Sequence, residues 1–395
     1  MSQRTITVIT SSRADYGHLY WPLVELQNHP DIELRLVAIG PHLSPEFGRT
    51  VTVIEGDGFL LDAKIECLLS SDSDVAMAKT IGIATMGLAD YLGDNRPDLL
   101  LVIADRYEML APAAVALALR IPLVHIEGGE ASEGAIDHAV RNALTMMSHV
   151  HLTPTELSRE RVLIMGENPA RVHCVGAPSL DHLRRTPLWS REETSRELDL
   201  TFGDPMILVG YHPETLAEDT LAGADEVFAA LEILAASRQI VFCFPNADAG
   251  SRALIERSRS FCGAHPKASL HVNLDPKRYW SLLRQVDLLL GNSSSGIMET
   301  PSLRIPAVNI GDRQQGRERA ANIIDVESER TKIVAAVERG LRPEFRASLE
   351  GLSNPYGDGR ASQEIVEILA QIELGPDLLR KKAVDPNAVT PRLSQ

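Results

Sequence analysis

Short apolar segments rich in β-branched residues alternate along the chain with stretches in which apolar residues recur every three or four positions. The first pattern is typical of buried strands and the second of amphipathic helices. Alternating strands and helices indicate an α/β domain with a mostly parallel sheet. In the first half, helices are predicted over residues 107–119 and 135–147, among others, and strands over residues 5–10, 33–39, 98–104, 122–126, 149–153 and 171–175.

A charged stretch with few sustained apolar runs separates this series from a second one of the same kind. The second series predicts strands over residues 206–211, 240–244, 270–272, 286–290 and 307–310. A polar tail with scattered proline follows, and it is expected to be disordered. The predicted organisation is a first domain over 1–180, a linker over 181–204, a second domain over 205–358, a final helix over 359–373 and the tail over 374–395.

Composition narrows the function classes. The 395 residues, 44% of them hydrophobic, are enough for two or three domains with their own cores. The net charge of −15 argues against nucleic-acid or anionic-membrane partners, because no basic surplus is present to neutralise phosphates. The amino-terminal residues lack the apolar stretch of a signal peptide, and no run reaches the length of a membrane span. The four widely spaced cysteines suit a reducing compartment, so a cytoplasmic protein is expected.

Several common catalytic motifs are absent. The first predicted strand is followed by SSRADYG rather than by GxGxxG, and the sequence contains neither GxxxxGK[ST] nor GxSxG. His125 and Glu127 resemble the HxE of zinc deaminases, but no PCxxC partner follows. His149 and His151 share one face of a predicted strand without an evident third ligand. No metal site is therefore predicted.

Carboxylates follow two neighbouring strands of the first domain. Asp105 comes directly after the strand over 98–104, and Glu127 and Glu130 flank the Gly128-Gly129 turn after the next one. The two glycines are expected to let the backbone turn sharply and a ligand approach closely. Ligands of such sheets bind beyond the carboxyl ends of the strands. This placement favours a ligand-binding role for these carboxylates over the alternatives, which are capping of the following helix and exposure to solvent in a loop. Asp137 and Arg141 lie one turn apart on the following helix. They are either part of the site or an ordinary surface ion pair.

Residues suited to phosphate follow the strands of the second domain. The run Gly291-Asn292-Ser293-Ser294-Ser295-Gly296 precedes a short helix, and small residues before a helix start can present backbone N–H groups to an anion. Arg313 and Arg317 follow the next strand, and Arg13 would face them across the cleft. His212 directly follows the strand over 206–211 and completes this lining.

Together these segments resemble the UDP-N-acetylglucosamine 2-epimerase family, and most closely its hydrolysing branch. The resemblance covers about residues 3–372. It rests on SSRADYG, ADRYE, HIEGGE, GAIDHAVRNALTMMSHVH, YHPET, FPNADAG, GNSSSGIMETPS, NIGDRQQGRE and NPYGDG, which stand in this order. The GGE and SHVH features point to the hydrolysing side. The resemblance implies a GT-B-type α/β fold, in which two Rossmann-like domains with parallel sheets face a central cleft and the final helix packs back on the first domain.

The resemblance also implies a reaction and roles. UDP would leave C1 of UDP-N-acetylglucosamine as the C2 proton is lost, and water would add to the resulting glycal to give N-acetylmannosamine. No cofactor is implied, and a dimer or tetramer is expected. Where some relatives carry a second acid, this chain has His138. The catalytic candidates are Asp105, Glu127, Asp137, Arg141 and His212, and the UDP- and sugar-binding candidates are Arg13, Arg106, Glu130, Asn246, Ser293, Ser294, Ser295, Gly296, Glu299 and Arg313.

Other functions remain open at this point. The same chemistry on a UDP-linked 2,4-diacetamido sugar or on GDP-N-acetylglucosamine, for legionaminic-acid-type sugars, differs only in pocket details. A non-hydrolysing epimerase would keep the nucleotide attached. A GT-B glycosyltransferase would need an acceptor site, and a nucleotide-sugar sensor would not need the three carboxylates. The sequence does not decide which carboxylate is the base and which the acid.

Overall fold

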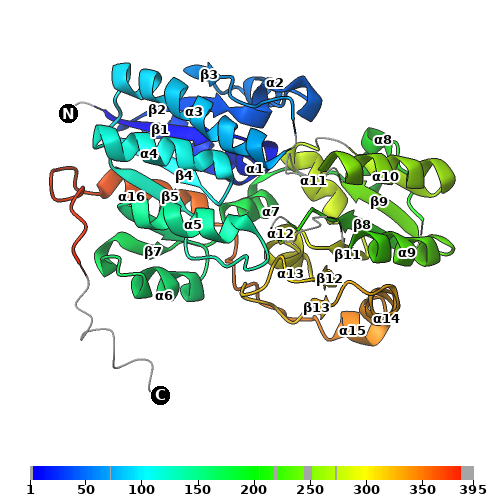
Figure 1. Ribbon diagram of the computed structural model, residues 1–395. Coiled ribbons are helices and arrows are strands. Elements are labelled where there is room, and N and C mark those ends of the chain that lie inside the picture. Colours follow the sequence, from blue (N-terminus) through cyan, green and yellow to red (C-terminus); the bar gives the residue numbers. More distant parts are fainter. Residues whose placement is uncertain are drawn as a thin grey trace.

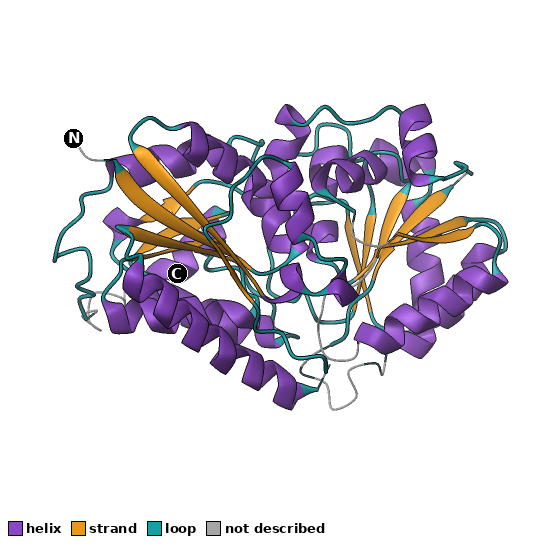
Figure 2. Ribbon diagram, turned by 90° about the horizontal axis from the view of Figure 1, so that it is seen from above, coloured by secondary structure: helices purple, strands orange, loops and turns teal. Residues whose placement is uncertain are grey.

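The chain forms two open sheets, each covered by helices on both faces, that lie side by side (Figures 1 and 2). The computed structural model describes residues 3–71, 73–203, 205–214, 216, 221, 223–243, 251–271 and 274–383. All strand pairs within the two sheets are parallel. The predicted fold class, α/β with two Rossmann-like domains, is confirmed.

The first sheet has seven strands in the order β3-β2-β1-β4-β5-β6-β7. Its central strand β4 (LLLVI) is a continuous apolar run, because helices cover both faces of the sheet. The chain reverses direction across the sheet between β1 and β4, the point where ligands of doubly wound sheets bind. The strands are β1 (Arg4–Thr10), β2 (Ile32–Ile39), β3 (Ala63–Ile65), β4 (Leu99–Ile103), β5 (Leu123–Ile126), β6 (Val150–Thr153) and β7 (Val172–Cys174). The helices that accompany them are α1 (Arg13–Asn28), α2 (Val51–Gly56), α3 (Asp74–Asp94), α4 (Leu110–Leu119), α5 (Ile136–Met147) and α6 (Glu156–Ile164), with 3-10 turns at Gly40–Leu43, Pro45–Phe47, Tyr107–Met109, Pro169–Arg171 and Pro178–Leu180.

The second sheet repeats this winding with six strands in the order β10-β9-β8-β11-β12-β13. Its reversal point lies between β8 and β11, so the two reversal points open toward the space between the domains. The strands are β8 (Met206–Gly210), β9 (Gln239–Cys243), β10 (Ala268–His271), β11 (Leu288–Gly291), β12 (Ala307–Ile310) and β13 (Ile323–Val326). The helices from the connection onward are α7 (Asp181–Arg185), α8 (Arg191–Leu198), α9 (Ala224–Ala235), α10 (Ser251–Ala264), α11 (Pro276–Leu283), α12 (Ser294–Met298), α13 (Thr300–Leu303), α14 (Arg330–Gly340), α15 (Pro343–Ala347) and α16 (Ala361–Gln371).

The last helix, α16, returns to the first domain (Figure 1). Its apolar face is buried with that of α1, and Asp181 accepts hydrogen bonds from the backbone N–H groups of Ala361 and Ser362 at 3.0 and 2.9 Å. The disorder expected for the tail does not hold for residues 374–383. Leu378 is buried in the first core, and Lys381 pairs with Glu167 at 2.5 Å, so this segment packs against the first domain.

Two strands were missed by the sequence pattern. β3 and β13 are edge strands of three and four residues, and neither carries the apolar run of a central strand. An edge strand shows less of its surface to the core, so its sequence carries a weaker signal. In the described parts of the chain, no helix is both long and apolar enough to cross a membrane.

Candidate active site

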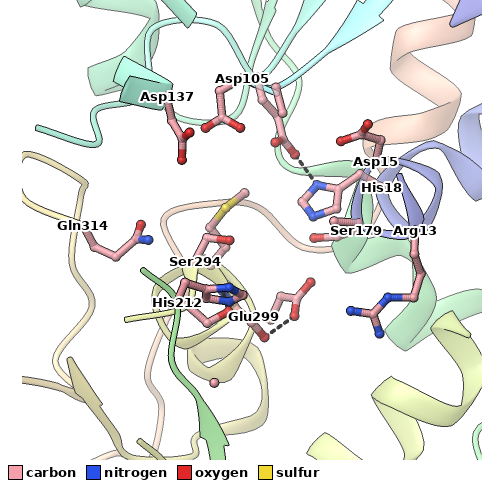
Figure 3. Close-up of a pocket in the computed structure, with 18 of the residues that line it drawn as sticks. Arg13, Asp15, His18, Asp105, Asp137, Ser179, His212, Ser294, Glu299 and Gln314 are labelled. Carbon is pink, nitrogen blue, oxygen red and sulfur yellow. Dashed lines mark hydrogen bonds and ion pairs between the residues drawn. The ribbon is translucent and has the colours of Figure 1, made fainter. Parts of the chain in front are cut away.

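A deep cleft runs between the carboxyl ends of the two sheets. It encloses about 1500 Å³ with its open mouth included, and side chains from both domains line it (Figure 3). All but two of the predicted site residues line this cleft. The exceptions are Gly296, which is not in the lining, and Asn246, which lies outside the described residues.

Asp105 follows β4 and is held by a buried arginine. The Arg141 guanidinium, on α5, donates to the Asp105 carboxylate and also to the Glu130 carbonyl and the Ser132 hydroxyl, both at 3.1 Å. The Arg141 side chain is only 1% exposed. Arg141 therefore orients Asp105, and its Nη1 and Nη2 groups are engaged within the first domain.

Glu127 follows β5 and is paired with a histidine that the sequence did not single out. His18 Nδ1, on α1, donates to Glu127 Oε1 at 2.6 Å. Burial disfavours both charged forms, but their mutual attraction and hydrogen bond outweigh it, so the pKa of Glu127 is lowered and that of His18 is raised to about 9. The pair is thus a carboxylate and an imidazolium at neutral pH.

The backbone is strained at Ala104, just before Asp105, and at Glu127. Ala104 and Glu127, at the ends of the adjacent strands β4 and β5, have φ of 58° and 65°, a region that non-glycine residues rarely adopt. Such strain is found where the surrounding structure fixes a functional geometry. Here it turns the chain at the carboxyl edge of the sheet, just where the cleft is lined.

Asp137 reaches the second domain. It lies in the first turn of α5, and Arg313 Nη2 donates to its carboxylate at 3.2 Å across the cleft. Arg313 Nη1 donates to the Asn292 carbonyl at 3.1 Å. Arg313 therefore bridges Asp137 of the first domain and the serine-rich turn of the second.

Glu130 has partners that differ from those of the other carboxylates. It accepts from the Ser158 hydroxyl at 2.5 Å and from the Tyr356 hydroxyl at 3.0 Å, and it pairs with Arg317 at 3.4 Å. The side chain is almost completely buried. Glu130 touches the cleft, but its carboxylate ties α6, the second domain and the segment before α16 together.

The Gly128-Gly129 turn was expected to let a ligand approach, and the structure corrects this reading. A Cβ at Gly129 would clash with the Ser158 carbonyl, and one at Gly128 would lie 2.9 Å from the His125 ring. Neither glycine lines the cleft. The two glycines are required by close packing inside the first domain.

The turn after β11 faces the cleft from the second domain. Ser293 caps α12, and the Ser295 hydroxyl donates to Glu299 and contacts the Tyr279 hydroxyl. Burial raises the pKa of Glu299. Gly296 was predicted to contact the ligand, but a Cβ there would lie 3.1 Å from Leu289 Cδ2, so this glycine faces the sheet.

The remaining predicted residues also have structural partners. His212 is held through its backbone, because its N–H donates to Asn292 Oδ1 at 2.7 Å and its carbonyl accepts from Asn292 Nδ2 at 2.9 Å. Arg13, at the start of α1, donates to the Leu274 carbonyl of the second domain at 3.1 Å. Arg106 pairs with the buried Glu108 at 3.0 Å.

Several cleft residues were not predicted as site residues. They include His18, Asp15, Tyr279 and Gln314, whereas Arg317 was expected at this edge and does line the cleft. Asp15 forms the capping box of α1 with Ser12, and burial raises its pKa. His18 stands three residues after Asp15, a spacing that places both on one helix face and was the available signal.

The three candidate catalytic carboxylates lie on the wall of the first domain together with His18 and three arginines, and Arg313, Arg317 and the N–H groups at the start of α12 lie on the opposite wall. Three ionisable carboxyl groups near one point can remove and deliver protons, and the facing cations can stabilise a departing anion. Among the described residues, no group of three or more His, Cys, Asp or Glu side chains is placed to bind a metal ion.

Comparisons with known proteins agree with this geometry. The family described as UDP-N-acetylglucosamine 2-epimerase matches residues 24–370. A GDP/UDP-N,N'-diacetylbacillosamine 2-epimerase (hydrolyzing) from Campylobacter jejuni is 36% identical over 329 residues, covering 83% of this chain and 85% of that protein. A UDP-N,N'-diacetylbacillosamine 2-epimerase (hydrolyzing) from Legionella pneumophila is 35% identical over 379 residues, covering 96% and 98%.

A solved structure shares the two-domain fold. The UDP-GlcNAc 2-epimerase from Neisseria meningitidis, in a crystal structure bound to UDP-GlcNAc, superposes with a TM-score of 0.79 at 21% identity and covers 94% of this chain and 100% of that one. The GT-B-type arrangement expected from the sequence is thereby confirmed. With a family match across most of its length, two relatives above 30% identity and the shared fold, the chain belongs to the UDP-N-acetylglucosamine 2-epimerase family.

Proposed function

We propose that this enzyme is a hydrolysing 2-epimerase of a nucleotide-linked N,N'-diacetylbacillosamine, with UDP as the preferred nucleotide. The observation that carries the proposal is the 35–36% identity to two relatives named for this reaction, one of which aligns over 96% of the chain. The cleft supports it, because acid–base groups and phosphate-binding groups face each other there. This substrate class replaces UDP-N-acetylglucosamine, which the sequence motifs alone favoured.

In the first stage of the proposed reaction, a carboxylate takes the C2 proton while the C1–O bond to the diphosphate breaks. The electron pair of the C2–H bond becomes the C1=C2 bond of a glycal. Asp105, Glu127 and Asp137 are the candidate bases, and each has a cationic partner that favours its ionised form.

In the second stage, water adds to C1 and a proton returns to C2 from the opposite face. Because removal and delivery occur on different faces of the ring, at least two of the three carboxyl groups must take part. The Ser293–Ser295 turn and the arginines of the facing wall would hold the diphosphate during both stages.

UDP-N-acetylglucosamine is the second candidate substrate. The family description and the co-linear motifs favour it. The two substrates differ at C4 and C6 of the sugar, away from the reacting C1 and C2 atoms. The same carboxylates would therefore serve either one.

The test is a substrate panel. The purified chain is incubated with UDP- and GDP-linked N,N'-diacetylbacillosamine, with UDP-N-acetylglucosamine and with GDP-N-acetylglucosamine, and the products are identified by NMR. We expect release of UDP and the free 2-epimerised diacetamido sugar, with the highest kcat/KM for the UDP-linked diacetamido sugar. Preference for UDP-N-acetylglucosamine would reverse the order of the candidates. Accumulation of a nucleotide-linked epimer without free UDP would exclude hydrolysis.

A further inference from the structure

His18 occupies the centre of the cleft. It projects from the second turn of α1 between the carboxylates of the first domain and Glu299 of the second (Figure 3). Its side chain is 21% exposed, and the exposed part faces the cavity. The ring is therefore accessible to a molecule bound in the cleft.

The two ring nitrogens have different surroundings. Nδ1 is used by the 2.6 Å hydrogen bond to Glu127, which also fixes the ring orientation. Nε2 has no hydrogen-bond partner among the described residues. The titratable groups around the ring are Glu127 at the end of β5, Glu299 after α12, Asp15 on α1 and His182 on α7. Three of these four are carboxyl groups, so the surroundings favour an imidazolium with one N–H directed at the ligand space.

The other cations of the cleft are less available. Arg141 donates to Asp105 and is buried, Arg313 is shared between Asp137 and the Asn292 carbonyl, and Arg13 donates to the Leu274 carbonyl. Arg106 pairs with Glu108, and Arg317 pairs with Glu130. A partner within the protein takes up part of the hydrogen-bonding capacity of each of these guanidinium groups. His18 can keep its bond to Glu127 and bind an anion through Nε2 at the same time.

We propose that His18 is a catalytic residue that donates a hydrogen bond from Nε2 to the departing diphosphate, while Glu127 holds the ring in its charged form. This inference rests on the proposed function. In the step concerned, the C1–O electron pair leaves with the diphosphate oxygen, and the C2 proton passes to a carboxylate. His18 keeps both of its protons throughout. It acts through a donor placed where negative charge develops.

Three variants test the assignment. His18→Gln keeps a polar side chain but cannot carry charge, and His18→Lys keeps the charge. His29→Gln makes the same exchange at the far end of α1, where the ring accepts only from the Asp31 N–H. We expect His18→Gln to lose about 10²–10³-fold in kcat, the usual effect of removing one such donor. His18→Lys should recover part of this loss, and His29→Gln should match the unaltered enzyme.

The pH profile separates a charged donor from a merely structural histidine. The imidazolium is present below its pKa of about 9 and is lost above it. The profile of kcat/KM reports the free enzyme, so it should fall as the pH rises through about 9, and this alkaline limb should disappear in His18→Gln. A folded His18→Gln enzyme that keeps the limb, or whose kcat is within threefold of the parent value, would overturn the proposal.

UDP binding provides a readout that needs no turnover. Calorimetry at pH 7 should show a loss of UDP affinity of about tenfold in His18→Gln, because a charge-assisted contact to phosphate is removed. If the parent enzyme hydrolyses none of the nucleotide sugars but this affinity loss is found, the proposed function fails and the contact stands. If the parent enzyme is active and His18→Gln binds UDP unchanged with an intact fold, the contact is disproved and the function stands. If the parent enzyme is inactive and the affinity is unchanged, both fail.

Discussion

At the scale of single residues, each of the three candidate catalytic carboxylates has its own cation. Arg141 serves Asp105, His18 serves Glu127, and Arg313 serves Asp137. When carboxylates crowd together, one of them usually holds a proton. Separate cationic partners let the three acids line one cavity without sharing a proton. Each acid can then be assigned a role by its own variant.

Amide variants of the three carboxylates should bind UDP nearly normally and lose turnover. Asp105→Asn, Glu127→Gln and Asp137→Asn should each reduce kcat by about 10²–10⁴-fold, the range typical of general acid–base groups. The measurement is UDP release together with exchange of the C2 proton in deuterated water. A variant that blocks only hydration should release the glycal, whereas one that blocks the first stage should show no exchange. Full activity in any one variant would leave that residue with a structural role only.

Arg313→Ala should weaken UDP binding about tenfold or more, because it removes a charge-assisted contact of about 1.5–3 kcal/mol. It also leaves Asp137 without this partner, so kcat should fall as well. Arg319→Ala is the matched control, since Arg319 lies in the same loop but pairs with the half-exposed Asp325 at 2.7 Å. Equal UDP dissociation constants for the two variants, measured by calorimetry, would remove Arg313 from the binding site.

The sequence predicted the cleft lining well and the pairings poorly. Asp105, Glu127 and Asp137 were found because each follows or opens an element at the carboxyl edge of a sheet. His18 was missed because its partner Glu127 is 109 residues away, and only the fold brings the two together. The buried network of Glu130 was missed for the same reason: Tyr356 is 226 residues further along the chain.

At the scale of elements, the central strands were predicted, whereas two of the four edge strands, β3 and β13, were not. The apolar runs of β4 and β8 and the β-branched residues of β1 identify these strands without any knowledge of their neighbours. β3 and β13 become strands only because a partner strand lies beside them. The segment 374–383 is polar and was expected to be disordered, yet its backbone carbonyls accept from Arg171 at 2.7 and 2.8 Å.

The start of α16 depends on a residue far away in the sequence. Asp181 is buried and accepts from the first two N–H groups of the helix, which otherwise lack partners. Asp181→Ala should lower the free energy of unfolding by about 1–3 kcal/mol, the cost of a buried donor left without a partner. Ser190→Ala, which removes the exposed cap of α8, should lower it by about 1 kcal/mol or less. Thermal unfolding compares the two, and a smaller effect at Asp181 would contradict this role.

At the scale of the whole molecule, hydrogen bonds and an ion pair join the two domains at several places. Arg161 donates to the Gly316 carbonyl at 2.5 Å in a half-buried contact, and Arg317 donates to the Ala131 carbonyl at 3.1 Å in a buried one. On the surface, the Arg252 guanidinium binds the Glu46 carboxylate through two hydrogen bonds at 2.7 and 2.9 Å. The first two contacts join the domains, and the surface pair holds the start of α10 against the first domain.

Breaking the surface pair should favour a more open cleft. Glu46→Arg and Arg252→Glu should each raise KM for the nucleotide sugar a few-fold with little change in kcat, and the double exchange should restore it. An exposed pair is worth about 0.2–1 kcal/mol, so the effect should also shrink at high ionic strength. Steady-state kinetics at two salt concentrations measures it. A double exchange no better than the single variants would show that the pair does not hold the cleft closed. A dimer or tetramer also remains a prediction, which light scattering can test.

The return of α16 to the first domain has a consequence for synthesis on the ribosome. The first core is lined by Ile365, Val366 and Leu369, so it stays incomplete until nearly the whole chain has been translated. Roughly 190 residues separate the end of the first sheet from α16. At about 5–20 residues per second, the synthesis of this stretch takes about 10–40 s. During this interval the apolar face of α1 is open to chaperones. The core of the second domain contains no residue of α16, so this domain can be complete before the first.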